Sequence, residues 1–165
     1  MRKFFYLLLL PVLLLSGSSC SEIMDPFEGS DGVRANINGY KCVMDGYHGN
    51  QYVTWPTGGS ATLSINVRMV KLLDNQNFML QLNVSDNTAV STGIEYHFTP
   101  GGPCSAILSS PPGAAGVEVP MSGWIRFLQL DAGSHIVEAE FELSGTAPRS
   151  REEFDVRHGF LRLYK

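Results

Sequence analysis

The residues best suited to bind a ligand lie in segment 47–59, which reads Tyr-His-Gly-Asn-Gln-Tyr-Val-Thr-Trp-Pro-Thr-Gly-Gly. Aromatic rings can stack on the C–H faces of a sugar, while amides hydrogen-bond to its hydroxyl groups. The candidate ligand-binding residues are Tyr47, Asn50, Gln51, Tyr52 and Trp55. The alternative is an ordinary strand that ends at Pro56 and whose aromatic side chains cover the core. The segment therefore predicts either a glycan site or, more simply, a core-covering strand.

The rest of the sequence lacks recognisable catalytic and metal-binding motifs. It has no Gly-x-Ser-x-Gly elbow and no His-x-x-x-His or Cys-x-x-Cys pair. Glu95 and His97 share one face of a predicted strand, and Glu138, Glu140 and Glu142 form a carboxylate row that could attract Ca²⁺. Solvated, charged strand faces explain both patterns more simply. We therefore expect a protein that is not an enzyme and has no metal and no cofactor.

Cys20 is the residue with the clearest predicted modification. It follows the basic residues Arg2 and Lys3, an apolar run over residues 4–15, and small residues at 16–19. The run is too short to cross a bilayer, which needs ~20 apolar residues in a helix. It instead has the length and order of an export signal. Residues 1–19 are therefore predicted to be a lipoprotein signal peptide, and Cys20 the lipidated N-terminus of the mature chain.

Lipidation at Cys20 predicts an exported protein. Acyl chains, palmitate among them, would hold it at the outer membrane, on the periplasmic face or the cell surface. Leu15 lies two residues earlier than the leucine of the common lipidation motif, so plain secretion with cleavage near Ser19 is the alternative. Loss of residues 1–19 leaves 10 basic against 16 acidic residues and moves the formal net charge from −4 to −6. This acidity argues against nucleic acid as a partner.

Lipidation of Cys20 leaves two further cysteines, Cys42 and Cys104. Because exported proteins meet an oxidising compartment, one Cys42–Cys104 disulfide is the simplest expectation. Closing that loop would stabilise the fold by ~4 kcal/mol in the chain-entropy model. The alternative is two buried free thiols, since unpaired cysteine packs as a small apolar side chain.

The mature chain divides into a tether and one domain. Residues 20–32 comprise the lipidated cysteine and an acidic, turn-rich segment, which predicts a flexible tether. Residues 33–165 are predicted to form a single domain. Segment 101–120, rich in Gly, Pro, Ser and Ala, is the most probable interruption, because Pro111-Pro112-Gly113 breaks any strand.

Apolar residues alternate with polar ones almost throughout this domain, which predicts strands rather than helices. Asn38-Gly39 indicates a two-residue type I′ hairpin turn. A strand over 122–130 contains Trp124, interpreted as structural, and a parity change near His158-Gly159 predicts a bulge. The predicted inward rows are Ala61, Leu63, Ile65, Val67 and Met69; Phe78, Leu80, Leu82 and Val84; Ile94, Tyr96 and Phe98; and Val137, Ala139, Phe141 and Leu143.

These patterns predict an all-β fold. About 8–10 antiparallel strands would form a β-sandwich or a flattened barrel. The alternative is a closed, lipocalin-like barrel with an apolar lumen.

Four segments carry a resemblance to a known group of proteins. They are Ala-Asn-Ile-Asn-Gly at 35–39, Gly-Trp-Ile-Arg-Phe-Leu-Gln-Leu-Asp at 123–131, Glu-Phe-Glu-Leu-Ser at 140–144, and Phe-Asp-Val-Arg-His-Gly-Phe at 154–160. In this order they resemble small, mostly uncharacterised outer-membrane lipoproteins of gut Bacteroidetes. This chain has Ala139 where that group often has glycine. The resemblance implies an all-β lipoprotein domain and brings no catalytic residues.

The expected function is therefore that of a non-catalytic binding or interaction module, held at the membrane by lipid. Its partner would be a glycan, a peptide or an envelope protein. One alternative is a carrier of a small hydrophobic ligand in the barrel lumen. Another is a structural or envelope-assembly lipoprotein. A hydrolase is the least expected, because its residues are not organised in any recognisable way.

Overall fold

A computed structural model describes residues 32–44, 52–55, 62–87, 89–111 and 116–164. Within those ranges the chain forms ten strands and no helix, and therefore no helix that could cross a membrane. The predicted signal peptide, Cys20 and the tether up to residue 31 lie outside them, as do Tyr47, Asn50 and Gln51. The strands are β1 (Gly32–Ile37), β2 (Tyr40–Met44), β3 (Tyr52–Thr54), β4 (Thr62–Lys71), β5 (Asn77–Ser85), β6 (Glu95–Phe98), β7 (Ser105–Ser110), β8 (Val117–Asp131), β9 (Ile136–Thr146) and β10 (Glu153–Leu163).

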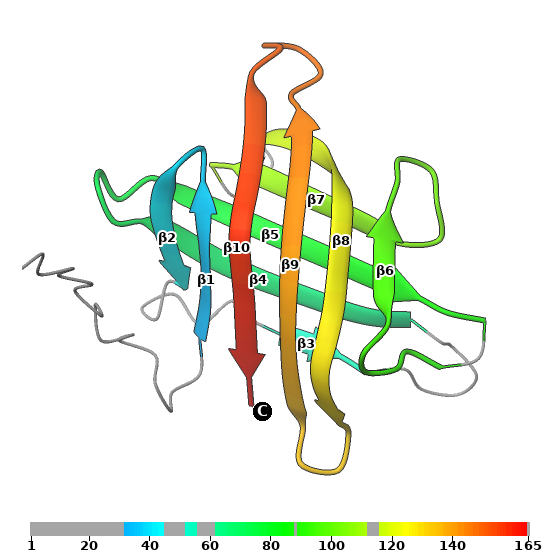
Figure 1. The fold of residues 1–165 in the computed structure, drawn as a ribbon. Coiled ribbons are helices and arrows are strands. Elements are labelled where there is room, and N and C mark those ends of the chain that lie inside the picture. The colour runs from blue at the N-terminus through cyan, green and yellow to red at the C-terminus, as the bar shows by residue number, and fades with distance from the viewer. Residues whose placement is uncertain (1–31, 45–51, 56–61, 88, 112–115, 165) are drawn as a thin grey trace, which may run out of the picture.

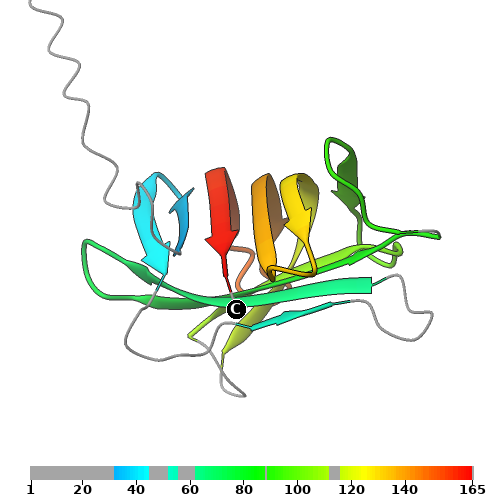
Figure 2. The same cartoon turned by 90° about the horizontal axis from the view of Figure 1, so that it is seen from below.

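Eight of these strands close into an antiparallel barrel. Their order is β1-β10-β9-β8-β7-β5-β4-β2, and β2 completes the circle by pairing with both β4 and β1. β3 adds to β4, and β6 adds to β8. Figure 1 shows β2, β1, β10, β9, β8 and β6 running across β7, β5, β4 and β3, and Figure 2 shows the two layers edge-on. The predicted all-β class and the flattened barrel are confirmed.

The inward rows of both layers form one hydrophobic core. Leu63, Ile65, Val67 and Met69 of β4 are no more than 1% exposed, and the predicted rows of β5 and β9 are buried as well. Ile94 is the exception, at 52% exposure, because it precedes the first residue of β6. The alternation read from the sequence thus identifies the core face of these strands correctly.

Strand β8 joins the two layers by changing partners at Gly123. Residues 117–121 pair with β7, whereas residues 123–126 pair with β6. Gly123 has φ +146°, and a Cβ atom there would lie 2.1 Å from the carbonyl oxygen of Glu142. Only glycine allows β9 to come this close at the bend.

The described part of segment 101–120 contains more strand than the sequence suggests. It contains all of β7 and the first residues of β8, with Pro120 opposite Ile107. The true break comes directly after β7, at Pro111. The prediction of a longer interruption was wrong because small and polar residues in Ser105–Ser110 hide the alternation of Ala106 and Leu108, which are both buried.

Strand β10 carries the bulge that its parity change predicted. Val156 pairs with Leu143 and Gly159 with Phe141, so Arg157 and His158 together occupy the place opposite Glu142. His158 takes up the extra residue with φ +52°. Beyond the bulge, Gly159, Leu161 and Leu163 are the buried positions.

The Asn38-Gly39 turn has positive φ at both residues, +51° and +81°, as a type I′ turn requires. Asn38 also fastens this hairpin to β10. Its Oδ1 accepts a hydrogen bond from the backbone N–H of Asp155 at 2.8 Å, and its Nδ2 donates to the carbonyl of Glu153 at 3.1 Å.

An Asn38→Gly variant is therefore expected to keep the turn but lose both side-chain bonds, at a cost of about 1–2 kcal/mol in unfolding free energy. Asn38→Ala should cost about 1–2 kcal/mol more, because alanine disfavours positive φ. Urea titrations followed by circular dichroism measure both values. Wild-type stability in either variant would contradict the clamp.

The predicted Cys42–Cys104 disulfide is absent, and both cysteines are buried free thiols. Cys42 lies opposite Lys71, at the turn of the β4–β5 hairpin. The Cys104 thiol donates to the carbonyl of Ser85 at 3.5 Å, at the other end of β5. That strand separates them by roughly 27 Å at ~3.4 Å per residue, far beyond the ~7 Å between Cα atoms that a disulfide allows.

Burial raises the pKa of the Cys42 thiol, which disfavours the reactive thiolate. In a Cys20→Ser variant of the full chain, we expect Cys42 and Cys104 to resist iodoacetamide under native conditions. Both should react once the protein is unfolded in guanidinium without reductant, as mass spectrometry would show. A requirement for prior reduction would instead reveal a disulfide.

Candidate binding groove on the outer face of the barrel

The structure does not combine the described members of the sequence-predicted site into one surface. Tyr52 is 50% exposed on β3. Trp55 instead packs against the core, with its ring edge-on to His135 at 6.4 Å between centroids. Trp55 thus takes the core-covering role of the alternative interpretation. Whether Tyr47, Asn50 and Gln51 complete a site lies outside the described residues.

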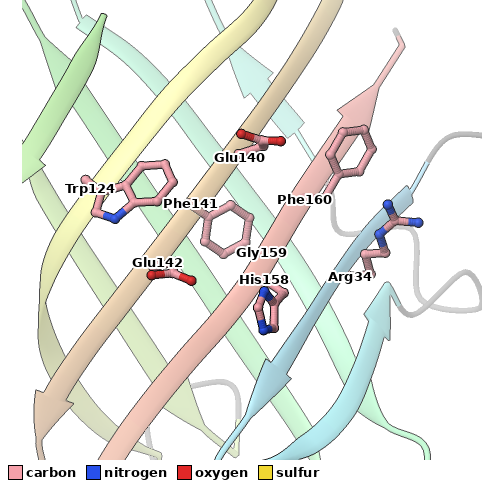
Figure 3. Close-up of a pocket in the computed structure, with 8 residues that line it drawn as sticks. All are labelled: Arg34, Trp124, Glu140, Phe141, Glu142, His158, Gly159 and Phe160. Carbon is pink, nitrogen blue, oxygen red and sulfur yellow. The ribbon is translucent and has the colours of Figure 1, made fainter.

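A different surface is hollowed on the outer face of the layer that contains β1, β10, β9 and β8. We call it the outer groove; it has a volume of about 370 Å³. Pockets of about 300–1,000 Å³ are typical of small-ligand sites. Figure 3 shows its lining residues, which come from four neighbouring strands. They are Arg34, Trp124, Glu140, Phe141, Glu142, His158, Gly159 and Phe160.

Two aromatic side chains flank the outer groove. Trp124 projects from β8 and Phe160 from β10, on either side of β9 (Figure 3). Both are half-buried, so each keeps ring surface accessible to a ligand. Phe141 and Gly159 are fully buried and form the floor between them. The groove therefore offers two separated rings above an apolar floor.

Cations hold these rings in place. The Arg34 guanidinium lies 4.8 Å from the centroid of the Phe160 ring, and the Arg126 guanidinium lies 5.9 Å from that of Trp124. Cation–π contacts of this kind stabilise exposed aromatic side chains modestly, by ≈ 0.5–1 kcal/mol. Both rings are therefore partly preorganised.

The groove carboxylates are paired with arginines from neighbouring strands. Arg126 contacts Glu140 at 2.8 Å, and Arg157 contacts Glu142 at 3.4 Å. The hydrogen bond to Glu140 raises the pKa of Arg126 above its ordinary value, and the bond to Asp155 does so for Arg157. These exposed pairs add little stability, but they fix where each carboxylate points.

The bulge in β10 brings His158 into the groove. Two residues there face one residue of β9, so the outward direction shifts along β10. Without the bulge His158 would face inward like Val156, two residues before it; with the bulge it shares the outer face with Phe160 and lines the groove. The bulge thus adds a polar imidazole side chain to the aromatic flank.

A second hollow of about 120 Å³ continues the outer groove beside Gly123. It shares Trp124 and Glu142 with the larger hollow and adds the polar residues Ser122 and Ser144. The two hollows therefore adjoin each other at Trp124 and Glu142.

The predicted carboxylate row is present but does not gather around one point. Glu138 contacts Arg162 at 3.0 Å, and the other two carboxylates have the arginine partners given above. Glu95 lies 3.9 Å from Arg126, and His97 is exposed beside it on β6. Among the described residues, no group of three or more His, Cys, Asp or Glu side chains is placed to hold a metal ion. Glu95 and His97 thus lie on a solvated face, whereas the three glutamates of β9 are half-buried and ion-paired.

Trp124 is interpreted from the sequence as structural and carries no binding role there. The structure places it on the outer face, because the buried residues of β8 around it are Ile125 and Phe127. The parity of the strand carried this signal: two apolar residues at 125 and 127 leave 124 on the opposite face. Phe160 faces outward only because the bulge before it reverses the alternation of β10.

Comparisons with known proteins add no identification. No family model matches this sequence, and no curated protein or solved structure matches it either.

Proposed function

We propose that this protein is an exported, lipid-anchored binding module whose ligand occupies the outer groove. The single observation that carries the proposal is the groove itself, about 370 Å³ with Trp124 and Phe160 on its flanks. Both rings are half-buried and line a hollow on a sheet, and aromatic side chains in such a position are typical of binding surfaces. Cys20 supplies the anchor, and the domain supplies the surface.

A hydrophobic-ligand carrier is the weaker candidate. An eight-stranded barrel is just wide enough either to be filled by side chains or to hold one small ligand. Here the inward rows belong to one continuous core that includes Phe98, Phe127 and Phe141, each no more than 1% exposed. The accessible hollow with polar groups lies on the outside, which favours surface binding.

A glycosidase is also weaker, although Glu140 and Glu142 lie in a groove with aromatic flanks. Glycoside hydrolysis needs one carboxyl that carries a proton and a second that is ionised. Each groove carboxylate pairs with one arginine, Glu140 with Arg126 and Glu142 with Arg157, so the two carboxylates have similar surroundings. Such a pair suits positioning and hydrogen bonding better than acid catalysis.

Lipid anchoring is tested by expressing the full chain with an alkyne-tagged palmitate analogue. We expect label on the wild-type protein and its recovery with the outer membrane, and neither for a Cys20→Ser variant. Equal membrane recovery of the two proteins would contradict anchoring through Cys20.

Binding is tested by screening the full chain against polysaccharides, peptides and detergent-solubilised envelope proteins. Whatever binds should bind a Trp124→Ala/Phe160→Ala variant at least about tenfold more weakly, since buried aromatic contacts dominate binding energy. Tyr52→Ala is the matched control, because this tyrosine is exposed on β3, in the other layer. If only Tyr52→Ala loses binding, the ligand binds at β3 and the outer groove is not the site.

A further inference from the structure

We infer that the ligand of the outer groove is an uncharged segment of an oligosaccharide, lying across β8, β9 and β10. This inference rests on the proposed binding function and adds the chemical class of the ligand. It follows from the mixture of charges, the type of contact surface and the distance between the backbones of Trp124 and Phe160.

Charges of both signs surround the groove. Three guanidinium groups, those of Arg34, Arg126 and Arg157, are interleaved with four carboxylates, those of Glu95, Glu140, Glu142 and Asp155. A polyanion would meet these carboxylates and a polycation would meet the guanidinium groups, at a cost in either case. A neutral ligand meets only hydrogen-bonding groups that are already held in position.

The contact surface suits sugar rings better than peptide. Peptides that bind sheets add to an unpaired strand edge or insert side chains into apolar pockets. β8, β9 and β10 each have a neighbouring strand on both sides along the groove, so no strand edge is open there for a peptide to extend. What they offer is two rings among charged and hydroxyl side chains. That alternation matches the C–H faces and hydroxyl groups of a sugar.

The spacing of the rings sets the length of the ligand. Trp124 of β8 pairs with Glu142 of β9, and Phe160 of β10 pairs with Glu140 of the same central strand. Two inter-strand steps and one two-residue step along β9 separate their backbones by roughly 12 Å, which about two to three pyranose rings would span. The adjoining hollow, which contains Ser122 and Ser144, extends this path by hydroxyl groups suited to a further sugar.

The test is native affinity electrophoresis of the full chain through gels containing neutral galactomannan, xyloglucan or mixed-linkage β-glucan. Matched gels contain anionic polygalacturonate or heparin, and casein peptides are titrated by calorimetry. We expect retardation by at least one neutral polysaccharide and an affinity that changes less than about twofold between about 50 and about 500 mM NaCl. Trp124→Ala should weaken it at least about tenfold.

Trp124→Phe guards against a variant that simply fails to fold, because it keeps a ring and should retain most of the affinity. If only anionic polysaccharides or peptides bind, and Trp124→Ala removes that binding, the ligand class is wrong while the proposed site stands. The ligand class is also wrong if no neutral polysaccharide retards the protein. If Trp124→Ala binds every ligand as the wild type does, the site and the proposed function both fall.

Discussion

A Gly123→Ala variant is expected to be the most destabilised single substitution on the outer layer, losing about 3–5 kcal/mol of unfolding free energy. Two penalties combine at this position. The backbone has φ +146°, which costs a non-glycine residue of order 1–3 kcal/mol. The added Cβ would also lie 2.1 Å from the Glu142 carbonyl oxygen and 2.9 Å from Cα of Leu143.

Both of these atoms belong to the backbone of β9, so no side chain can rotate away to relieve the contact. β8 and β9 would have to separate where they carry Trp124 and Glu142, and the outer groove would open with them. We therefore expect Gly123→Ala to lower the thermal midpoint by about 10 °C or more, and to weaken ligand binding at temperatures where it remains folded.

Gly93→Ala is the matched control for this prediction. Gly93 also has positive φ, +77°, but nothing lies within 4 Å of the Cβ position. It should lose only about 1 kcal/mol, so the difference between the two variants measures the contact with β9 together with the more restrictive φ of Gly123. Scanning calorimetry measures both. Equal midpoints for Gly93→Ala and Gly123→Ala would show that close packing at the bend is unimportant.

Gly159→Ala is the second large effect, expected to cost about 2–4 kcal/mol through overpacking. Its Cβ would lie 2.4 Å from Cε2 of Phe141 and 2.6 Å from the Phe141 carbonyl oxygen. The Phe141 ring is fully buried in the core, so it has no open space into which it can move.

A Phe141→Leu substitution in the Gly159→Ala background tests this contact directly. Leucine removes the ring, so part of the lost stability should return, whereas Phe141→Leu alone should destabilise the wild type. Gly133→Ala serves as the control, since its nearest atom is an exposed aspartate oxygen at 3.3 Å. Additive losses in the double variant, measured by urea unfolding, would rule out a Gly159–Phe141 clash.

The fold was predictable because its signals are local. Alternation with period two fixes which face of β4, β5 and β9 is buried, and Asn38-Gly39 specifies its turn through the positive φ that both residues tolerate. The change of alternation at His158 likewise predicts the bulge, because it is a local feature of one strand. β7 was missed because Ser105–Ser110 has too few apolar residues for the alternation to stand out.

The outer groove was not predictable as a unit, since it depends on which strands become neighbours. Arg34 and Phe160 are far apart in sequence and meet only because β1 pairs with β10. The disulfide prediction failed on the same point, because compartment and cysteine count say nothing of the length of β5 between Cys42 and Cys104. Only the outward direction of Trp124 could have been read from its own strand.

The central claim is that ligand occupies the outer groove against Trp124. The chain has two tryptophans, and Trp55 can be replaced by phenylalanine without loss of a hydrogen bond to any described residue, because its indole nitrogen has no such partner. In a Trp55→Phe variant of the full chain, Trp124 is the sole indole. Titration with the neutral polysaccharide that retards the protein in the gels should shift its fluorescence to a plateau, and the midpoint of that change should fall at the concentration that half-saturates binding. Full binding with unchanged Trp124 emission would contradict the account.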